Sequence, residues 1–212
     1  TVVVPSGNVR LAGTLTLPPG AGPHPAVILI TGSGPEDRDE AIMGHRPFLV
    51  LADHLTRHGF AVLRCDDRGV GASTGNFAEA TEDDFVADTL AQLADLRTRP
   101  EIDGQRIGLL GHSEGAIIAP RVAVQSTHVA FLVLLAGPGV PMDELLVRQG
   151  RDIAGVMGVG PEGLKDNEEL QRALFRILKT EPDRTKAEAA VRKLFDERLG
   201  RPVLGLGDHV AG

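Results

Sequence analysis

The sequence contains no Tyr and no Trp, and Phe accounts for only seven of its 212 residues. A protein that binds single-stranded nucleic acid needs aromatic side chains on which the bases stack. The 29 acidic residues outnumber the 22 basic ones and give a formal net charge of -7, which repels a polyanion. We therefore expect no nucleic-acid partner.

Cysteine and long apolar runs are scarce as well. Cys65 is the only cysteine in the sequence, which excludes an internal disulfide, and no Cys or His cluster has metal-ligand spacing. The longest apolar run covers residues 129–136, eight residues, whereas a membrane helix needs about 20. We expect no structural metal and no membrane span. The sequence opens at Thr1 and not at Met, so a cleaved leader peptide is one alternative. A cytoplasmic location is the default expectation.

Short apolar segments alternate with amphipathic ones over residues 1–140. This order predicts an α/β domain whose mostly parallel sheet is covered by helices on both faces. The turn residues Ser6, Gly7 and Asn8 join a first antiparallel pair of strands. The predicted strands cover residues 2–4, 9–17, 26–31, 60–65, 106–110 and 129–135, and the predicted helices cover residues 47–58, 82–97 and 114–124.

The pattern changes in residues 141–212, where three amphipathic helices are expected at residues 142–157, 164–178 and 184–199. The one strand-like segment there, residues 203–206, is doubtful. We interpret residues 141–212 as a truncated helical cap. The alternative is a plain layer of helices against the sheet, but such helices would be interleaved with strands.

The segment Gly111-His112-Ser113-Glu114-Gly115 matches G-x-S-x-G and lies between a predicted strand and a predicted helix. This is the setting of a nucleophile elbow, a sharp strained turn that exposes a serine hydroxyl above the sheet. We predict that Ser113 is the catalytic nucleophile. The alternative is a glycine-rich turn that carries an incidental serine.

Acyl transfer also needs two N–H donors for the oxyanion. The backbone N–H of Glu114 follows the nucleophile directly, and the N–H of Ser33 lies in the glycine-rich loop after the third strand. We predict that these two groups form the oxyanion hole. In the alternative, Gly32 and Gly34 merely make a tight turn.

Three segments together, GHSEG at 111–115, TGSGPEDRDE at 31–40 and DDRGVGAS at 66–73, resemble the α/β-hydrolase superfamily. More narrowly, they resemble its bacterial branch of serine esterases and serine aminopeptidase-like hydrolases. The resemblance implies an α/β-hydrolase sheet, a helical cap after the sixth strand and an acyl-enzyme intermediate. It assigns the 66–73 loop a structural role. No cofactor is implied, because the sequence has neither a P-loop nor a Rossmann glycine fingerprint.

In that superfamily the catalytic acid and histidine follow the nucleophile on the last two strands, and no such strands are predicted here. His128 leads into the sixth strand, and the adjacent Asp208 and His209 cannot occupy two separate strand ends; His112 is expected to point away from Ser113. The preferred explanation is that the C-terminal part of the core is missing, so that this fragment alone is inactive and its apolar sheet edge needs self-association or a missing segment. A non-catalytic binding scaffold and a relocated base are the alternatives.

For the substrate we expect a small-molecule carboxylic ester, with Met142, Leu145 and Leu146 lining a dry acyl pocket. The alternative is an aminoacyl amide whose ammonium is held by Glu36, Asp37 or Asp39. The charged run at residues 35–40 is interpreted first as a solvated loop. Cys65 is interpreted as a small buried hydrophobic residue, not as a second nucleophile.

Overall fold

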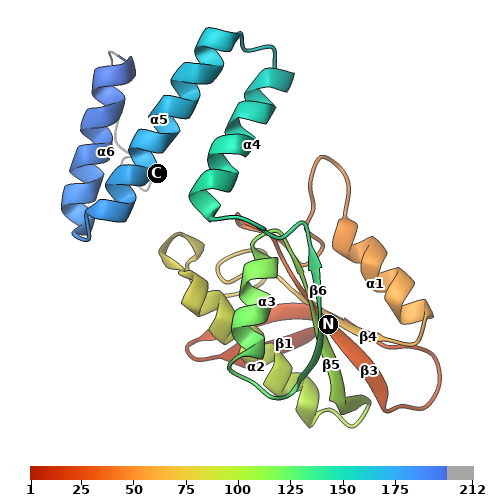
Figure 1. Ribbon diagram of the computed structural model, residues 1–212. Helices are drawn as coiled ribbons and strands as arrows, with labels where there is room; N and C mark the ends of the chain where they lie inside the picture. The colour runs from red at the N-terminus through yellow and green to blue at the C-terminus, as the bar shows by residue number, and fades with distance from the viewer. Residues whose placement is uncertain (200–212) are drawn as a thin grey trace. The chain divides into compact units, whose positions relative to one another are not determined.

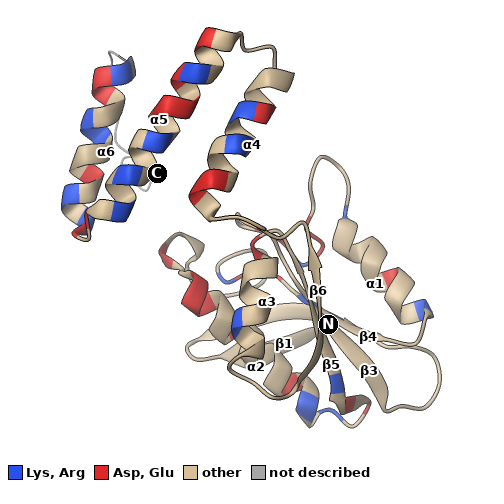
Figure 2. Ribbon diagram, viewed as in Figure 1, with Lys and Arg blue, Asp and Glu red and all other residues tan. Residues whose placement is uncertain are grey.

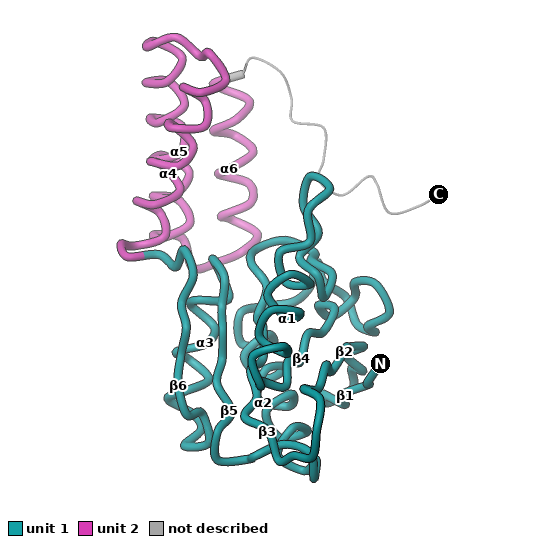
Figure 3. The backbone as a smooth tube through the Cα atoms, turned by 90° about the vertical axis from the view of Figure 1, so that its right-hand side faces the viewer, with its two compact units in different colours: residues 1–138 teal, residues 139–212 magenta. Residues whose placement is uncertain are grey.

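A computed structural model describes residues 1–199 of the 212-residue chain. The chain divides into two compact units, Thr1–Pro138 and Gly139–Gly212, coloured separately in Figure 3. The predicted boundary at residue 140 lies close to this division. The interpretation of the second unit as a cap stays a prediction.

The first unit is built on one six-stranded sheet (Figure 1). Its strands are β1 (Val2–Ser6), β2 (Val9–Thr16), β3 (His24–Ile30), β4 (Ala61–Cys65), β5 (Ile102–His112) and β6 (Val129–Leu135). The spatial order is β1-β2-β4-β3-β5-β6. β1 pairs antiparallel with β2, and β2 with β4, whereas the pairs β3/β4, β3/β5 and β5/β6 are parallel. The predicted mostly parallel sheet with an antiparallel entry pair is confirmed.

Helices cover both faces of this sheet, as the alternation of side chains on β3 shows. Val27 and Leu29 pack in one cluster with Phe48 and Ala52 of α1 (Pro47–Arg57). Residues 26, 28 and 30 of the same strand face the opposite cluster, which contains side chains of α2 (Glu82–Thr98) and α3 (Gly115–Ala123). A strand that is apolar on both faces therefore lies in the interior of the sheet, as its sequence predicts.

Local signals explain where these helices begin. Pro47 occupies the first turn of α1, where a missing N–H is tolerated. Thr81 caps α2, and its side chain and that of Asp84 form a reciprocal capping box. A single 3-10 turn, η1 (Phe77–Glu79), precedes α2. The capping box of α2 satisfies backbone groups that the helix itself leaves unpaired.

Strand β6 forms one edge of the described sheet, where β5 is its only hydrogen-bonded neighbour. Its apolar side chains from Phe131 to Leu135 are between 36% and 48% exposed. An unpaired apolar edge of this kind is unusual on a protein surface.

The second unit contains α4 (Met142–Val156), α5 (Pro161–Thr180) and α6 (Arg184–Leu199). α5 packs against both α4 and α6, and ion pairs add to both interfaces: Lys179–Asp143 at 2.6 Å and Arg198–Glu169 at 3.5 Å. Figure 2 shows charges of both signs along all three helices. The three predicted helices are confirmed, and the doubtful strand at 203–206 lies outside the described residues. No helix within residues 1–199 is long and apolar enough to cross a membrane.

Candidate active site

Ser113 stands on a sharp turn between the end of β5 and the start of α3. Its φ of +52° places it in the left-handed region, which non-glycine residues occupy at a cost of about 1–2 kcal/mol. Its N–H donates to the carbonyl oxygen of Leu135 at 2.9 Å, so the edge strand helps to hold the turn. The strand–turn–helix geometry of the G-x-S-x-G motif is therefore present.

The two glycines of the motif are required by close backbone approaches. A Cβ on Gly111 would collide with the carbonyl oxygen of Gly115, and a Cβ on Gly115 would collide with that of Ile30. The absence of both side chains lets α3 begin directly against the ends of β3 and β5. This packing forces the sharp bend at Ser113.

Two backbone N–H groups near the elbow remain without an acceptor. Within residues 1–199, neither the N–H of Ser33 nor that of Glu114 donates a hydrogen bond. The loop that carries Ser33 lies against the elbow, because a Cβ on Gly32 would be 3.4 Å from the Cβ of Ser113. Free N–H groups beside a serine hydroxyl are what an oxyanion hole needs.

A cleft of about 180 Å³ opens beside Ser113. Its lining includes Ser33, Glu36, Glu40, Ile42, His112 and Ser113. It is smaller than the 300–1,000 Å³ or so that is typical of drug-sized ligands. The described part of the first unit therefore has room for a small group at Ser113.

The interpretation of residues 35–40 as a solvated loop is wrong. Arg38 pairs with Asp66 at 2.7 Å, and Asp39 pairs with Arg64, whose side chain is only 4% exposed. Glu40 is 6% exposed. The charged run is a partly buried ion-pair network, because Arg64 of β4 pairs with Asp39 and Asp66, which follows β4, pairs with Arg38. An arginine within an otherwise apolar predicted strand was the sequence signal for it.

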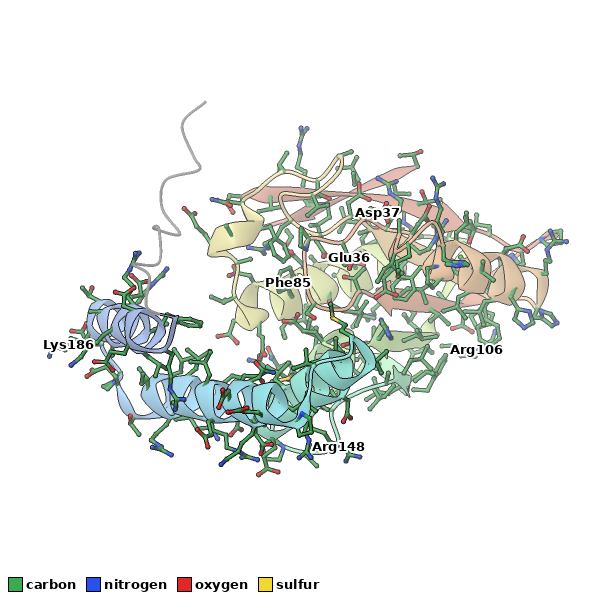
Figure 4. The ribbon with its side chains drawn as sticks, turned by 90° about the horizontal axis from the view of Figure 1, so that it is seen from above. Glu36, Asp37, Phe85, Arg106, Arg148 and Lys186 are labelled. Atoms are coloured by element: carbon green, nitrogen blue, oxygen red, sulfur yellow. The ribbon has the colours of Figure 1, made fainter. Side chains whose placement is uncertain are left out.

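The three acidic residues proposed to hold a substrate ammonium differ in their surroundings. Asp37 accepts the backbone N–H of Asp39 at 2.9 Å, and Asp39 is engaged by Arg64. Glu36 instead lines the cleft; Figure 4 labels it beside Asp37. Burial, then the charges of Glu40 and Asp37, raise the pKa of Glu36. Of the three, only Glu36 lines the cleft.

His112 and Glu40 form a contact that the sequence did not predict. Nδ1 of His112 lies 2.7 Å from Oε1 of Glu40, and the same oxygen accepts the N–H of Gly32 at 2.8 Å. His112 makes no hydrogen bond to Ser113, as expected. No histidine within residues 1–199 does so, and Asp208 and His209 lie outside the described residues. The described chain thus supplies a serine without its general base.

The 66–73 loop makes structural contacts. Asp66 accepts from Arg38 and from the N–H of Ala72, and Arg68 pairs with Asp84 and Asp88 of α2 at 2.7 and 2.8 Å. These bonds join the end of β4 to α2 and to the charged run at residues 35–40. A structural role, as the resemblance implies, agrees with this geometry.

Two further titratable groups at the end of β4 have displaced pKa values. Burial raises the pKa of the Cys65 thiol to about 12, so Cys65 is a buried neutral thiol, not a nucleophile. Burial also raises the pKa of Asp67 to about 7, although its carboxylate accepts the hydroxyl of Thr31 at 2.8 Å and the N–H of Glu36 at 3.1 Å. Asp67 is therefore protonated more readily than an ordinary carboxyl.

The residues predicted to line the acyl pocket lie on the first turns of α4, in the second unit. Met142 and Leu146 are 38% and 37% exposed. Their assignment, and that of Leu145, to a pocket stays a prediction. Among residues 1–199, no group of three or more His, Cys, Asp or Glu side chains is arranged to hold a metal ion.

The sheet, its two helical layers and the strained serine between β5 and α3 define an α/β hydrolase, and comparison with solved structures agrees. A proline iminopeptidase-related protein from Thermus thermophilus is 26% identical, with a TM-score of 0.56 over 92% of this chain and 58% of its own. An esterase from Pyrococcus furiosus is 23% identical, with a TM-score of 0.57 over 75% of this chain and 58% of its own.

Residues 46–192 match the hydrolase family described as serine aminopeptidase S33, and the chain belongs to this family. Esterase EstD from Thermotoga maritima is 31% identical over 195 residues, which are 91% of this chain and 45% of EstD. The chain thus spans less than half the length of this curated relative.

Proposed function

We propose that this chain is the nucleophile-bearing part of a serine hydrolase that cleaves carboxylic esters of modest size. The observation that carries the proposal is the left-handed φ of +52° at Ser113, close to the N–H groups of Glu114 and Ser33, which have no acceptor among residues 1–199. Strain of this kind persists only where the surroundings enforce it, and it concentrates at functional sites. The esterase names of two similar proteins favour an ester as substrate.

In the proposed reaction, Oγ of Ser113 attacks the ester carbonyl and gives up its proton to a histidine. The N–H groups of Ser33 and Glu114 stabilise the negative oxygen of the tetrahedral intermediate. The intermediate expels the alcohol, which takes the proton from the histidine, and the serine remains acylated. A water molecule then attacks the acyl group in the same way and releases the carboxylic acid and the free serine. No histidine within residues 1–199 is hydrogen-bonded to Ser113, and the proposal leaves the histidine and its acidic partner unassigned.

The cleft beside Ser113 supports a second candidate, an aminoacyl amide substrate. Glu36 lines this cleft, and in this candidate its carboxylate pairs with the free ammonium of an aminopeptidase substrate, the activity that the family description names. In the ester proposal, an apolar pocket binds the acyl group instead. A non-catalytic scaffold remains the third candidate.

The proposal is tested by Ser113→Ala in the protein expressed from its complete natural gene. We expect kcat/KM for p-nitrophenyl acetate to fall by about 10³-fold or more, because the nucleophile is removed. Circular dichroism checks that the fold is intact. Wild-type protein is expected to react covalently with a fluorophosphonate, and the variant is not. Turnover that survives in the variant would show that Ser113 is not the nucleophile. A wild-type protein that does not react with the fluorophosphonate would favour the non-catalytic binding scaffold.

Ester and amide substrates are separated by Glu36→Gln, with Glu79→Gln at an exposed position as the matched control. An esterase hydrolyses nitrophenyl esters far faster than aminoacyl nitroanilides, and loss of the Glu36 charge leaves ester turnover within a few-fold of wild type. For the aminopeptidase, nitroanilide turnover dominates and collapses in Glu36→Gln alone. The second result would replace the ester proposal by the amide one.

A further inference from the structure

One carboxylate oxygen links the two chain segments that bring Ser33 and Ser113 together. Oε1 of Glu40 accepts the N–H of Gly32 at 2.8 Å and lies 2.7 Å from Nδ1 of His112. Gly32 directly precedes Ser33, and His112 directly precedes Ser113. Glu40 therefore holds the residue before each of the two serines.

Glu40 occupies this position at an energetic cost. Its φ of +52° is in the left-handed region, and its side chain is 7% exposed. A buried carboxylate is tolerated only when it is hydrogen-bonded or paired, and backbone strain is tolerated only when neighbouring contacts enforce it. The N–H of Glu40 donates to the carbonyl of Asp37 at 2.9 Å, so another residue of the charged run helps to hold Glu40 in place.

The contact distances leave little freedom between the loop and the elbow. A Cβ on Gly32 would lie 3.3 Å from Oε1 of Glu40, 3.4 Å from Nδ1 of His112 and 3.4 Å from Cβ of Ser113. Gly32 thus packs against all three groups. A small movement of the Gly32 peptide would also turn the adjoining N–H of Ser33.

We propose that Glu40 is a positioning residue which, together with His112, aims the Ser33 N–H at the oxyanion that forms on attack by Ser113. The inference rests on the proposed function, because it explains how that function's oxyanion donor is held. Charge develops on the oxyanion only in the transition state, so misplacing the donor lowers kcat and leaves substrate binding nearly unchanged.

The test compares Glu40→Ala with Glu40→Gln in the protein from the complete natural gene. Glu40→Ala leaves the Gly32 N–H and the His112 ring without their shared acceptor, and we expect kcat to fall about 10- to 100-fold while KM changes by less than about threefold. The amide oxygen of glutamine can accept from both groups, so Glu40→Gln is expected to recover most of the loss. Glu79→Ala, which removes an exposed carboxylate, is the matched control.

Two further measurements separate positioning from a loss of folded protein. Rates are expressed per site that reacts with the fluorophosphonate, which removes the effect of an unfolded fraction. Phenylboronic acid forms a tetrahedral adduct on the serine. Its inhibition constant is expected to rise across the variants by the same factor by which kcat/KM falls. A merely structural role would lower the number of sites that react with the fluorophosphonate. It would leave kcat per reactive site and the inhibition constant of phenylboronic acid unchanged.

The outcomes also separate this inference from the proposed function. If the wild type turns over and per-site kcat in Glu40→Ala stays within twofold, or Glu40→Gln is no better than Glu40→Ala, the inference fails and the proposed function stands. A wild type that does not react with the fluorophosphonate overturns both the inference and the proposed function.

If Glu40→Ala does not fold, His112→Ala takes its place. This variant removes one of the two contacts of Glu40, and we expect a smaller loss of kcat per reactive site, about 3- to 10-fold. An unchanged per-site kcat there would overturn the inference equally.

Discussion

The N–H of Ser113 donates to the carbonyl oxygen of Leu135 at 2.9 Å, which ties the elbow to the edge strand β6. Ala136, the next residue of that segment, is also left-handed, with a φ of +51°. The strained serine is thus held from two directions: β5 and α3 fix the chain on either side of it, and β6 fixes its amide. The hydrogen bond also places the Ser113 N–H outside the set of donors available to an oxyanion.

Strain at Ser113 predicts a difference between two variants that both lack the hydroxyl. Ser113→Ala keeps a Cβ at a φ of +52°, whereas Ser113→Gly removes it. The left-handed conformation costs a non-glycine residue about 1–2 kcal/mol, and the extra freedom of glycine in the unfolded chain offsets about 0.5–1 kcal/mol of that gain. We expect Ser113→Gly to be more stable than Ser113→Ala by about 0.5–1 kcal/mol in urea unfolding. Equal stability of the two would mean that the turn is relaxed.

The ion pair between Asp39 and Arg64 predicts a large loss of stability in Asp39→Asn. The Arg64 side chain is 4% exposed, and its Nε has no hydrogen-bond partner among the described residues. Removing the opposite charge leaves a buried guanidinium uncompensated, which costs about 3 kcal/mol or more. Urea unfolding measures the loss.

Asp53→Asn is the control for this change, because Asp53 pairs with Arg57 on the exposed side of α1. Exposed pairs contribute little to stability, so its unfolding midpoint is expected to match that of the wild type. If Asp39→Asn is as stable as this control, Arg64 does not depend on Asp39. The predicted loss also means that lower activity in an Asp39 variant does not by itself indicate a role in substrate binding.

The sequence was informative where the governing interactions are local. Periodicity identifies β3 as a strand apolar on both faces, Thr81 marks the start of α2, and the glycine spacing around Ser113 predicts the turn that Gly111 and Gly115 make. Each of these features depends on residues within a few positions of one another. The order of the elements then leaves few ways to arrange the sheet.

The features missed depend on contacts between residues far apart in sequence. Glu40 and His112 are 72 positions apart, and Arg38 and Asp66 are 28 apart. A run such as Glu36-Asp37-Arg38-Asp39-Glu40 has the composition of a solvated loop. Arg64 in an apolar strand signals that a buried charge needs a partner, but only the fold shows that Asp39 supplies it. No periodicity encodes a left-handed glutamate, so the link between Gly32 and His112 had no local signal.

The raised pKa of Asp67 predicts how stability depends on pH. Its folded value is about 7, against an ordinary value of 3.8, so between these values the folded protein retains a proton that the unfolded chain has lost. Its contribution to stability is therefore fully present below about pH 4 and is lost as the pH rises to about 7. In Asp67→Asn the amide oxygen can accept from the Glu36 N–H while its NH₂ donates to Thr31. We expect this variant to gain stability relative to the wild type as the pH rises, and the gain to level off above about pH 7.

Urea unfolding of both proteins at about pH 5, 6, 7 and 8 measures this difference. Asp103→Asn is the matched control, because a hydrogen bond from Arg106 lowers the pKa of Asp103. A lowered folded pKa gives a contribution that is constant above the unfolded value, so the difference between this control and the wild type is expected to be flat over the same range. If the Asp67→Asn difference is flat as well, Asp67 loses its proton in the folded protein as easily as in the unfolded chain, and burial at the end of β4 does not displace its pKa.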